Sequence, residues 1–353
     1  MKIALNIELI QKLDNGIAIY TNNIYNRLKQ KNNGRYEFYK YILTPKNKWQ
    51  RVKKLFWTNI YLPIKLKLRG ISVYHNPDNV GLPFIKTCKF IVTIHDIVPY
   101  IFPKEYYPSQ VNFMKYRTKL LNTVKKADII LTDSIYSKND LVKYLGVNEN
   151  KIKVIYLGVD ENIKRTSDEE IINTKKKLNI ENKYILGIGG NEFRKNGVAL
   201  VKAFNEAKSQ GYLKDHKLVI IGKNVNGAKE ISENNDIILT GRVSENELLA
   251  LYSGADVFVY PSLYEGFGLP PLEAMACGTA VITSNTTSIP EVVGDAAILV
   301  DPNETEEIKE AICKVLENAS LKAELIEKGK ERVKQFKWDK TVEEVEQIYN
   351  ILG

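Results

Sequence analysis

The feature that most constrains the fold is a recurring short apolar run followed by an amphipathic stretch. Two such runs are Ile91-Val92-Thr93-Ile94 and Leu218-Val219-Ile220-Ile221. Strands buried on both faces have this composition, so the pattern predicts parallel sheets covered by helices. We expect strands at residues 2–9, 36–43, 90–95, 128–132, 153–157, 184–189, 217–222, 236–240, 256–261, 280–284 and 297–300.

The length of the chain, 353 residues, suits two α/β domains better than one core. The sequence turns polar and charged over residues 159–182, where we place the join. We predict Rossmann-like domains at 1–165 and 166–335, and a helix at 336–353 that packs back on the first domain. Open α/β sheets bind ligands at the carboxyl ends of their strands, so we expect a ligand cleft between the two domains.

Charge is unevenly distributed along the chain. Residues 1–165 carry 29 Lys+Arg against 12 Asp+Glu, and the remainder carries 22 against 30. The basic half predicts an anionic partner.

No apolar run reaches the roughly 20 residues of a membrane span, and the N-terminus has no signal-peptide core. The three scattered cysteines favour neither disulfides nor zinc. We therefore expect a cytoplasmic protein.

The most informative segment is Tyr260–Met275, which contains Glu265-Gly266-Phe267-Gly268-Leu269-Pro270-Pro271-Leu272-Glu273. A strand ends, and a loop follows in which Gly266 and Gly268 would allow unusual backbone φ angles and a close approach to a ligand. The prolines suit the first turn of a helix. Free amides and the helix dipole at such a start favour an anion, here a diphosphate. Glu273 could accept hydrogen bonds from a ribose and Glu265 could touch a reacting group. The alternative is that both acids only stabilise the helix dipole.

A second candidate phosphate element is Gly187–Asn196, which follows a predicted strand and precedes a helix. Its Arg194 offers a planar fork for phosphate oxygens and its Lys195 a point charge. A solvated loop is the alternative. The spacing of a nucleoside-triphosphate P-loop is absent.

These motifs resemble the retaining family 4 glycosyltransferases of the GT-B fold. The likeness rests on the Glu-x7-Glu spacing of residues 265–273. Further similar segments are 239–243, 276–282, 289–297, Arg194-Lys195-Asn196, Gly16–Tyr20 and His95-Asp96. It covers nearly the whole chain. It implies two Rossmann-like domains with parallel sheets facing across a cleft, the first binding the acceptor and the second a nucleotide sugar.

The resemblance also implies roles for single residues. Arg194, Lys195 and the backbone of Gly266, Phe267, Gly268 and Leu269 would hold the donor diphosphate. Glu273 would hold the ribose, and the backbone near Val243 the base. Gly16 would let a loop approach the donor, while His95 and Glu265 would contact the transferred sugar.

The absence of any Asp-x-Asp in the sequence favours a mechanism without a metal ion or other cofactor. We expect transfer with retention, in which the leaving diphosphate helps to take the acceptor proton. The resemblance is to mannosyltransferases of surface-polysaccharide synthesis, so the first expected donor is GDP-mannose, with rhamnosyl, glucosyl and N-acetylglucosaminyl donors as alternatives. The expected acceptor is a glycan or lipid-linked saccharide.

His95 ends a predicted strand, where its side chain could face a ligand, although a lone histidine also serves as a structural hydrogen bonder. Asp96 could cap or orient the same region. His75 is a weaker candidate for the cleft, with a role in a loop as the alternative.

Residues 47–70 combine seven Lys and Arg with Trp49, Phe56, Trp57 and Tyr61 and contain no acid. This suits an anionic membrane surface, and the enzyme would then be peripheral on the inner leaflet. The alternative is a solvated helix face with some buried aromatics.

Two other functions stay open. An epimerase or phosphorylase could share the fold, and a basic nucleic-acid-binding protein could explain the charge. No zinc finger, basic zipper or aromatic RNA-binding strand motif is present, so we expect no nucleic-acid partner.

Overall fold

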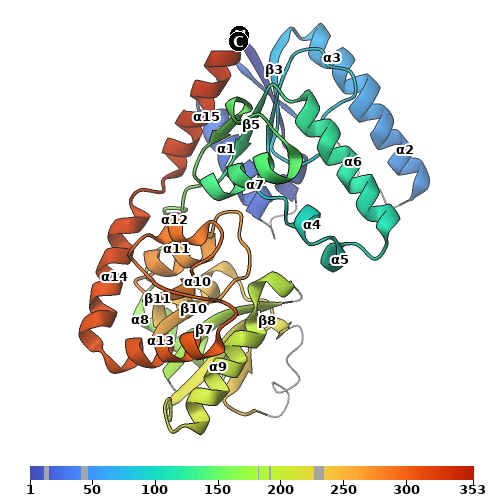
Figure 1. The fold of residues 1–353 in the computed structure, drawn as a ribbon. Coiled ribbons are helices and arrows are strands. Elements are labelled where there is room, and N and C mark those ends of the chain that lie inside the picture. The colour runs from blue at the N-terminus through green and yellow to red at the C-terminus, as the bar shows by residue number, and fades with distance from the viewer. Residues whose placement is uncertain (12–15, 41–46, 182, 191, 226–233) are drawn as a thin grey trace. The chain divides into compact units, whose positions relative to one another are not determined.

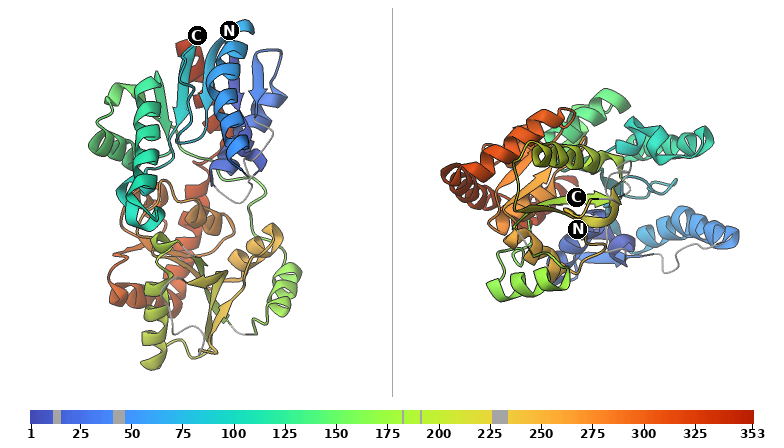
Figure 2. Two further views of the ribbon diagram at one scale, coloured as in Figure 1. Left: turned by 90° about the vertical axis from the view of Figure 1, so that its right-hand side faces the viewer. Right: turned by 90° about the horizontal axis from the view of Figure 1, so that it is seen from below.

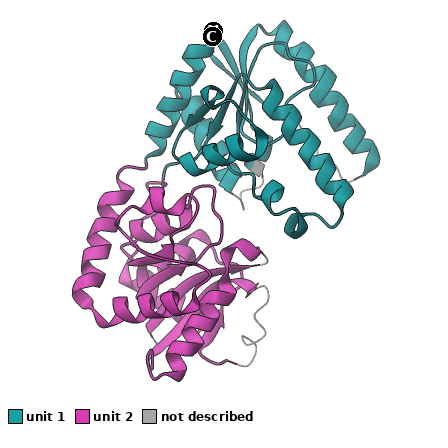
Figure 3. Ribbon diagram, viewed as in Figure 1, with its two compact units in different colours: residues 1–158, 337–353 teal, residues 159–336 magenta. Residues whose placement is uncertain are grey.

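The computed structural model describes residues 1–11, 16–40, 47–181, 183–190, 192–225 and 234–353 (Figure 1). They form two compact units, one of Met1–Gly158 with Lys337–Gly353 and one of Val159–Phe336 (Figure 3). We call these unit 1 and unit 2. Each contains a six-stranded sheet with helices packed against it (Figure 2).

In unit 1 the sheet has the order β2-β1-β3-β4-β5-β6, and all its neighbouring strands are parallel. Its strands are β1 (Lys2–Asn6), β2 (Tyr36–Tyr39), β3 (Ile71–Asn76), β4 (Lys89–Thr93), β5 (Ile129–Thr132) and β6 (Ile152–Val154). Its helices are α1 (Gly16–Gln30), α2 (Lys48–Phe56), α3 (Leu62–Leu68), α4 (Val98–Ile101), α5 (Pro103–Tyr106), α6 (Gln110–Lys126), α7 (Ile135–Leu145) and α15 (Trp338–Leu352).

The C-terminal helix α15 belongs to unit 1 and packs beside α1. Its Asp339 pairs with Arg27 at 2.7 Å and its Glu346 with Lys31 at 3.0 Å. The apolar face of α15 is buried, as its spacing of Val342, Val345, Ile348 and Tyr349 requires.

In unit 2 the sheet has the order β12-β11-β10-β7-β8-β9, again with parallel neighbours. Its strands are β7 (Lys183–Gly190), β8 (His216–Val225), β9 (Ile237–Leu239), β10 (Val257–Tyr260), β11 (Val281–Ser284) and β12 (Ile298–Val300). Its helices are α8 (Asp168–Lys177), α9 (Gly197–Ser209), α10 (Glu245–Gly254), α11 (Leu269–Ala276), α12 (Ile289–Val293), α13 (Thr305–Glu317) and α14 (Ala319–Val333).

The parallel α/β architecture predicted from the apolar runs is confirmed. One strand, β3, was not predicted, because Ser72, His75 and Asn76 interrupt its apolar pattern. It is nonetheless largely buried, and its central position pairs it with both β1 and β4.

The strand order of unit 2 determines where a ligand can bind. The chain passes from β7 outward to β8 and β9, then returns to the other side of β7 with β10. Such a reversal leaves a crevice at the carboxyl ends of the two central strands. The loops at that point follow β7 and β10, and they are the two segments singled out from the sequence.

Candidate active site

The segment after β10 folds into a loop and then helix α11. The helix begins at Leu269, directly after Gly268, with prolines in its first turn. Gly268 has a φ of +125°, and a Cβ there would lie 2.7 Å from Cδ1 of Ile289. The backbone angle favours glycine at this position, and any larger residue would also displace the end of the Ile289 side chain.

The start of α11 offers fewer amides than the sequence suggested. Pro270 and Pro271 have no N–H. Gly266 and Gly268 are buried, and Gly266 is not among the glycines with positive φ, so the unusual backbone expected for it is wrong. The amides of Gly268 and Leu269 donate to no acceptor in the part of the chain that the structure describes. These two amides are available to an anion.

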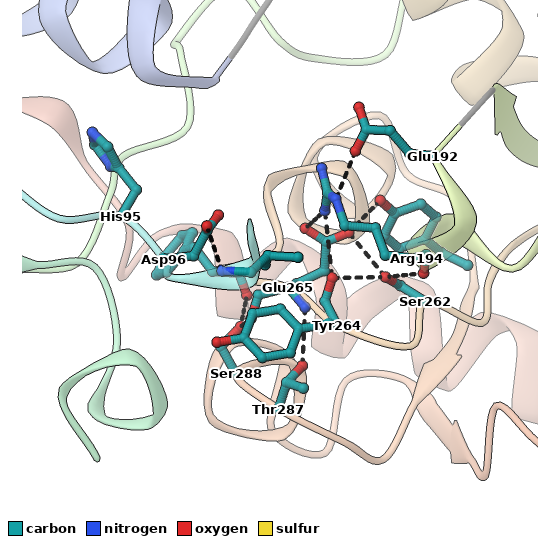
Figure 4. A network of polar contacts seen from close by, with 12 residues as sticks. His95, Asp96, Glu192, Arg194, Ser262, Tyr264, Glu265, Thr287 and Ser288 are labelled. Carbon is teal, nitrogen blue, oxygen red and sulfur yellow. Dashed lines mark hydrogen bonds and ion pairs between the residues drawn. The ribbon is translucent and has the colours of Figure 1, made fainter. Parts of the chain in front are cut away.

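Arg194 lies in the 3-10 turn that follows β7, and two carboxylates hold its guanidinium (Figure 4). Its Nη1 is 2.6 Å from Oε2 of Glu265, and its Nε is 2.6 Å from Oε2 of Glu192. The residue expected to bind a diphosphate is therefore paired with the acid expected to bind a sugar. A diphosphate would compete with these carboxylates for Arg194.

Four hydroxyl groups fix the position of Glu265. Tyr260 and Ser262 donate to its Oε1 at 2.6 and 3.0 Å. Its N–H donates to Oγ1 of Thr287 at 3.2 Å, and Ser288 donates to its carbonyl oxygen at 2.8 Å. Burial and the nearby carboxylate raise the pKa of Tyr260 well above its ordinary value, so it stays a donor.

These hydroxyls were not predicted from the sequence. Tyr260 and Ser262 lie in the segment Tyr260–Met275 but had no role assigned to them. For Thr287 and Ser288 the available signal was the run Thr283-Ser284-Asn285-Thr286-Thr287-Ser288 at the end of β11. In that run the hydroxyl oxygens of Ser284 and Thr286 are buried and find no hydrogen-bond partner among the described residues. Buried hydroxyls without partners are costly, so they suit contact with a polar ligand.

Glu273 lies in α11 and does not join the Arg194 cluster. Tyr252 donates to its Oε2 at 3.3 Å. Burial raises the pKa of Glu273 from 4.5 to about 7, although the hydrogen bond from Tyr252 opposes the rise. The carboxyl is therefore partly protonated near neutral pH.

Lys195 lies next to Arg194 in the same 3-10 turn and is half-buried. Its ammonium group has no ion-pair partner among the residues described, so it is available to an anion. Asn196 ends the turn with a φ of +52° and donates to the carbonyl of Pro302 at 2.6 Å. Val243 lies in the connection between β9 and α10 and is half-buried.

In unit 1, His95 follows β4 and is buried. Its Nδ1 lies 2.6 Å from Oδ2 of Asp133, and the ring of Tyr20 packs edge-on with centroids 4.9 Å apart. Burial opposes the imidazolium, but the charge and hydrogen bond of Asp133 outweigh it, so the pKa of His95 is raised. Its Nε2 is buried without a partner among the described residues.

Asp133 was not predicted as a site residue. It follows β5, the neighbour of β4, so its position at the same sheet edge as His95 was the available signal. Asp96 accepts from the N–H of Val98 at 3.1 Å and so orients the first turn of α4.

His75 lies within β3, not in a loop. Its Nδ1 is 2.7 Å from the hydroxyl of Tyr349 and its Nε2 is 2.8 Å from that of Thr93. Burial lowers the pKa of His75 to about 3, so the ring is neutral. It is fully buried and both nitrogens are used, so we do not include it in the site.

Gly16 begins α1 and is exposed, and a Cβ added there would meet no atom within 4 Å. Packing in unit 1 therefore does not require glycine at this position. Among the described residues, no group of three or more His, Cys, Asp or Glu side chains is arranged to hold a metal ion.

Comparison with known proteins identifies the family. Residues 168–332 match the family described as Glycosyl transferases group 1, and residues 15–163 match Glycosyltransferase Family 4. The O-antigen chain mannosyltransferase B of Escherichia coli is 32% identical over 293 residues, which are 79% of this chain and 74% of that protein. The chain belongs to glycosyltransferase family 4. It is thus an enzyme of the hexosyltransferase type, which disfavours the epimerase, phosphorylase and nucleic-acid-binding alternatives.

A second sequence relative and one solved structure are also similar to this family 4 glycosyltransferase. The serotype-specific mannosyltransferase WbdA of Escherichia coli is 29% identical over 265 residues, 72% of this chain and 32% of WbdA. The chain thus spans about a third of that longer relative. The sucrose-phosphate synthase of Thermosynechococcus elongatus has a TM-score of 0.77 at 18% identity and covers 100% of this chain and 99% of its own. That likeness supports the GT-B fold.

Proposed function

We propose that this enzyme is a retaining, metal-independent mannosyltransferase of surface-polysaccharide synthesis. It would move a hexose from a nucleotide-diphosphate sugar, GDP-mannose in the first instance, to a glycan or lipid-linked acceptor. The names of the two Escherichia coli relatives support the sugar and the pathway class.

The observation that carries the proposal is the Arg194–Glu265 ion pair at the carboxyl ends of β7 and β10. In the proposed mechanism the donor diphosphate takes Arg194, with Lys195 and the amides of Gly268 and Leu269 as further partners. Glu265 is then released from Arg194 and accepts hydrogen bonds from the sugar. Donor binding would thus free the Glu265 carboxylate from Arg194 only when a sugar is present to use it.

The rest of the donor would be held by residues around this centre. Glu273, in its ionised form, would accept from the ribose hydroxyls, and the backbone near Val243 would contact the base. Phe267 and Gly266 would line the diphosphate, and Gly16 would give the loop before α1 room to approach it. In this proposal unit 2 binds the nucleotide sugar and unit 1 the acceptor.

His95 would contact the transferred sugar through Nε2, and Asp133 is its positioning residue. The acceptor hydroxyl would attack the anomeric carbon as the bond to the diphosphate breaks. The acceptor proton would pass to an oxygen of the leaving diphosphate, so no protein base is required. Attack on the face that the diphosphate leaves gives retention.

The test is transfer from GDP-mannose, with product configuration read by NMR. A thermal-shift panel of GDP, UDP, dTDP and ADP should show the largest rise with GDP. Glu265→Gln should abolish transfer, whereas Glu310→Gln, which changes an exposed acid on α13, should leave it intact. An inverted product, or no stabilisation by any of the four nucleotides, would refute the proposal.

A further inference from the structure

An exposed apolar stripe runs along the segment from α2 to α3. Trp49, Val52, Phe56, Ile60, Ile64 and Leu68 recur every three or four residues, and Trp49 and Leu68 are 78% and 81% exposed. No residue of α2 is buried. The segment is anchored to the core from its other side by Leu62 and Leu66 of α3.

A π-helical turn, Trp57–Tyr61, lies in the middle of this segment. Successive steps of four residues drift by about 40° each in a regular α-helix, because each residue turns by about 100°. The wider π turn rotates each residue less and counters that drift. Ile64 and Leu68 therefore stay on the side of Trp49 and Phe56, which makes one continuous stripe.

The loop of residues 83–86 extends the apolar surface toward α6. The N–H of Phe84 donates to Oδ1 of Asn59 at 2.9 Å, which places the loop against the π turn. Lys126, at the end of α6, lies 4.5 Å from the ring centroid of Phe84 and donates to the carbonyl of Pro83 at 3.1 Å. Phe84 and Ile85 are more than half exposed.

Basic residues lie in the same segments as these apolar side chains. The segment 47–70 has seven Lys and Arg and no acid, and α6 has five and no acid. Helix α6 packs in the same core cluster as α3, and both helices project on the same side of unit 1 in Figures 1 and 2. Val111 and Met114 are exposed on α6, and Lys115 and Lys119 line the same shallow surface hollow.

We propose that the stripe from Trp49 to Leu68, with loop 83–86 and the exposed face of α6, docks unit 1 on an anionic lipid bilayer. Exposed aromatic and aliphatic side chains enter the interface while Lys and Arg meet lipid phosphates. A nucleic acid would use the cations but not the apolar stripe. No helix in the described part of the chain is long and apolar enough to span a bilayer.

This inference deepens the proposed function, because it names the surface that would bring the enzyme to a lipid-linked acceptor. It rests on unit 1 alone, and its test needs no nucleotide sugar. Failure of docking would leave the proposed transfer reaction intact, and failure of transfer would leave docking intact.

The experiment is co-sedimentation of the full chain with vesicles of phosphatidylglycerol and phosphatidylcholine, against vesicles of phosphatidylcholine alone. We expect binding to the anionic vesicles that weakens as salt is raised. The double substitution Trp49→Ala with Phe56→Ala should lower the vesicle partition coefficient by about tenfold or more. Each change removes a large apolar area that docking would bury in the bilayer. The matched control, Ile172→Ala with Tyr212→Ala, removes two exposed apolar side chains from unit 2 and should bind normally.

Tryptophan fluorescence gives a second measurement of docking, and a misfolded variant would not reproduce its result. The chain has three tryptophans, of which Trp338 is buried, Trp57 is half-buried and Trp49 is exposed. Docking should shift the emission to the blue, and Trp49→Phe should bind but lose most of that shift. The inference is overturned if anionic vesicles do not bind the folded protein at low salt. It is also overturned if the double variant binds normally, or if duplex DNA competes away all vesicle binding.

Discussion

Replacing Glu273 by Gln should stabilise the protein at alkaline pH. The pKa of the Glu273 carboxyl is raised from 4.5 to about 7, chiefly by burial. The folded state therefore binds this proton more tightly than the unfolded state. Its contribution to stability is complete below about pH 4.5 and is lost as pH rises through 7. The difference corresponds to about 3 kcal/mol, since one pKa unit is 1.36 kcal/mol.

The assay is urea unfolding followed by far-UV circular dichroism between pH 4.5 and 8.5. Glu273→Gln stays neutral, so we expect it to match the wild type at low pH and to exceed it by up to about 3 kcal/mol at high pH. All three tryptophans lie in unit 1, so their fluorescence follows unfolding of the other unit. Glu310→Gln, an exposed substitution on α13, is the matched control. Parallel stability curves for wild type and Glu273→Gln would show that the carboxyl is not perturbed.

Three further predictions concern the partner of His95 and two glycines. Asp133→Asn removes the charge that raises the pKa of His95, and we expect kcat to fall about tenfold to hundredfold, as for loss of a charged hydrogen bond. GDP affinity, measured by calorimetry, should stay the same; an unchanged kcat would remove Asp133 from the mechanism. Gly268→Ala should destabilise the fold by about 1–3 kcal/mol, because of its φ and the neighbouring Ile289. Gly16→Ala should leave the melting temperature unchanged and weaken donor binding. A stable Gly268→Ala variant would contradict the structural role of Gly268, and normal donor binding by Gly16→Ala would contradict the role of Gly16 in the donor site.

The sequence predicted most of the fold because buried parallel strands leave a strong signal. Continuous apolar runs such as Ile91–Ile94 can be seen without any structure. Strand β3 was not predicted, because His75 and Asn76 have the polar character of loop residues. His75 is tolerated in the core only because Tyr349 and Thr93 hydrogen-bond to its two nitrogens. Those partners lie far away in sequence, so local patterns could not reveal them.

The candidate site was only partly predictable for the same reason. The glycine and proline positions of the α11 loop follow from local backbone chemistry, and Gly268 has the expected positive φ. The pairing of Arg194 with Glu265 joins two loops 71 residues apart in the chain, through the pairing of β7 with β10. Likewise, the contact between His95 and Asp133 depends on β4 lying beside β5.

The most direct test of the account is calorimetric titration of GDP in the presence of a chelator. We expect an affinity equal to that without chelator, because Arg194, Lys195 and two amides meet the diphosphate charge. Lys195→Ala should lower that affinity about tenfold, as loss of a hydrogen bond to a charged group would. Lys202→Ala, an exposed substitution on α9, should not change it. Loss of GDP binding on chelation, with recovery on adding a divalent ion, would contradict the central claim.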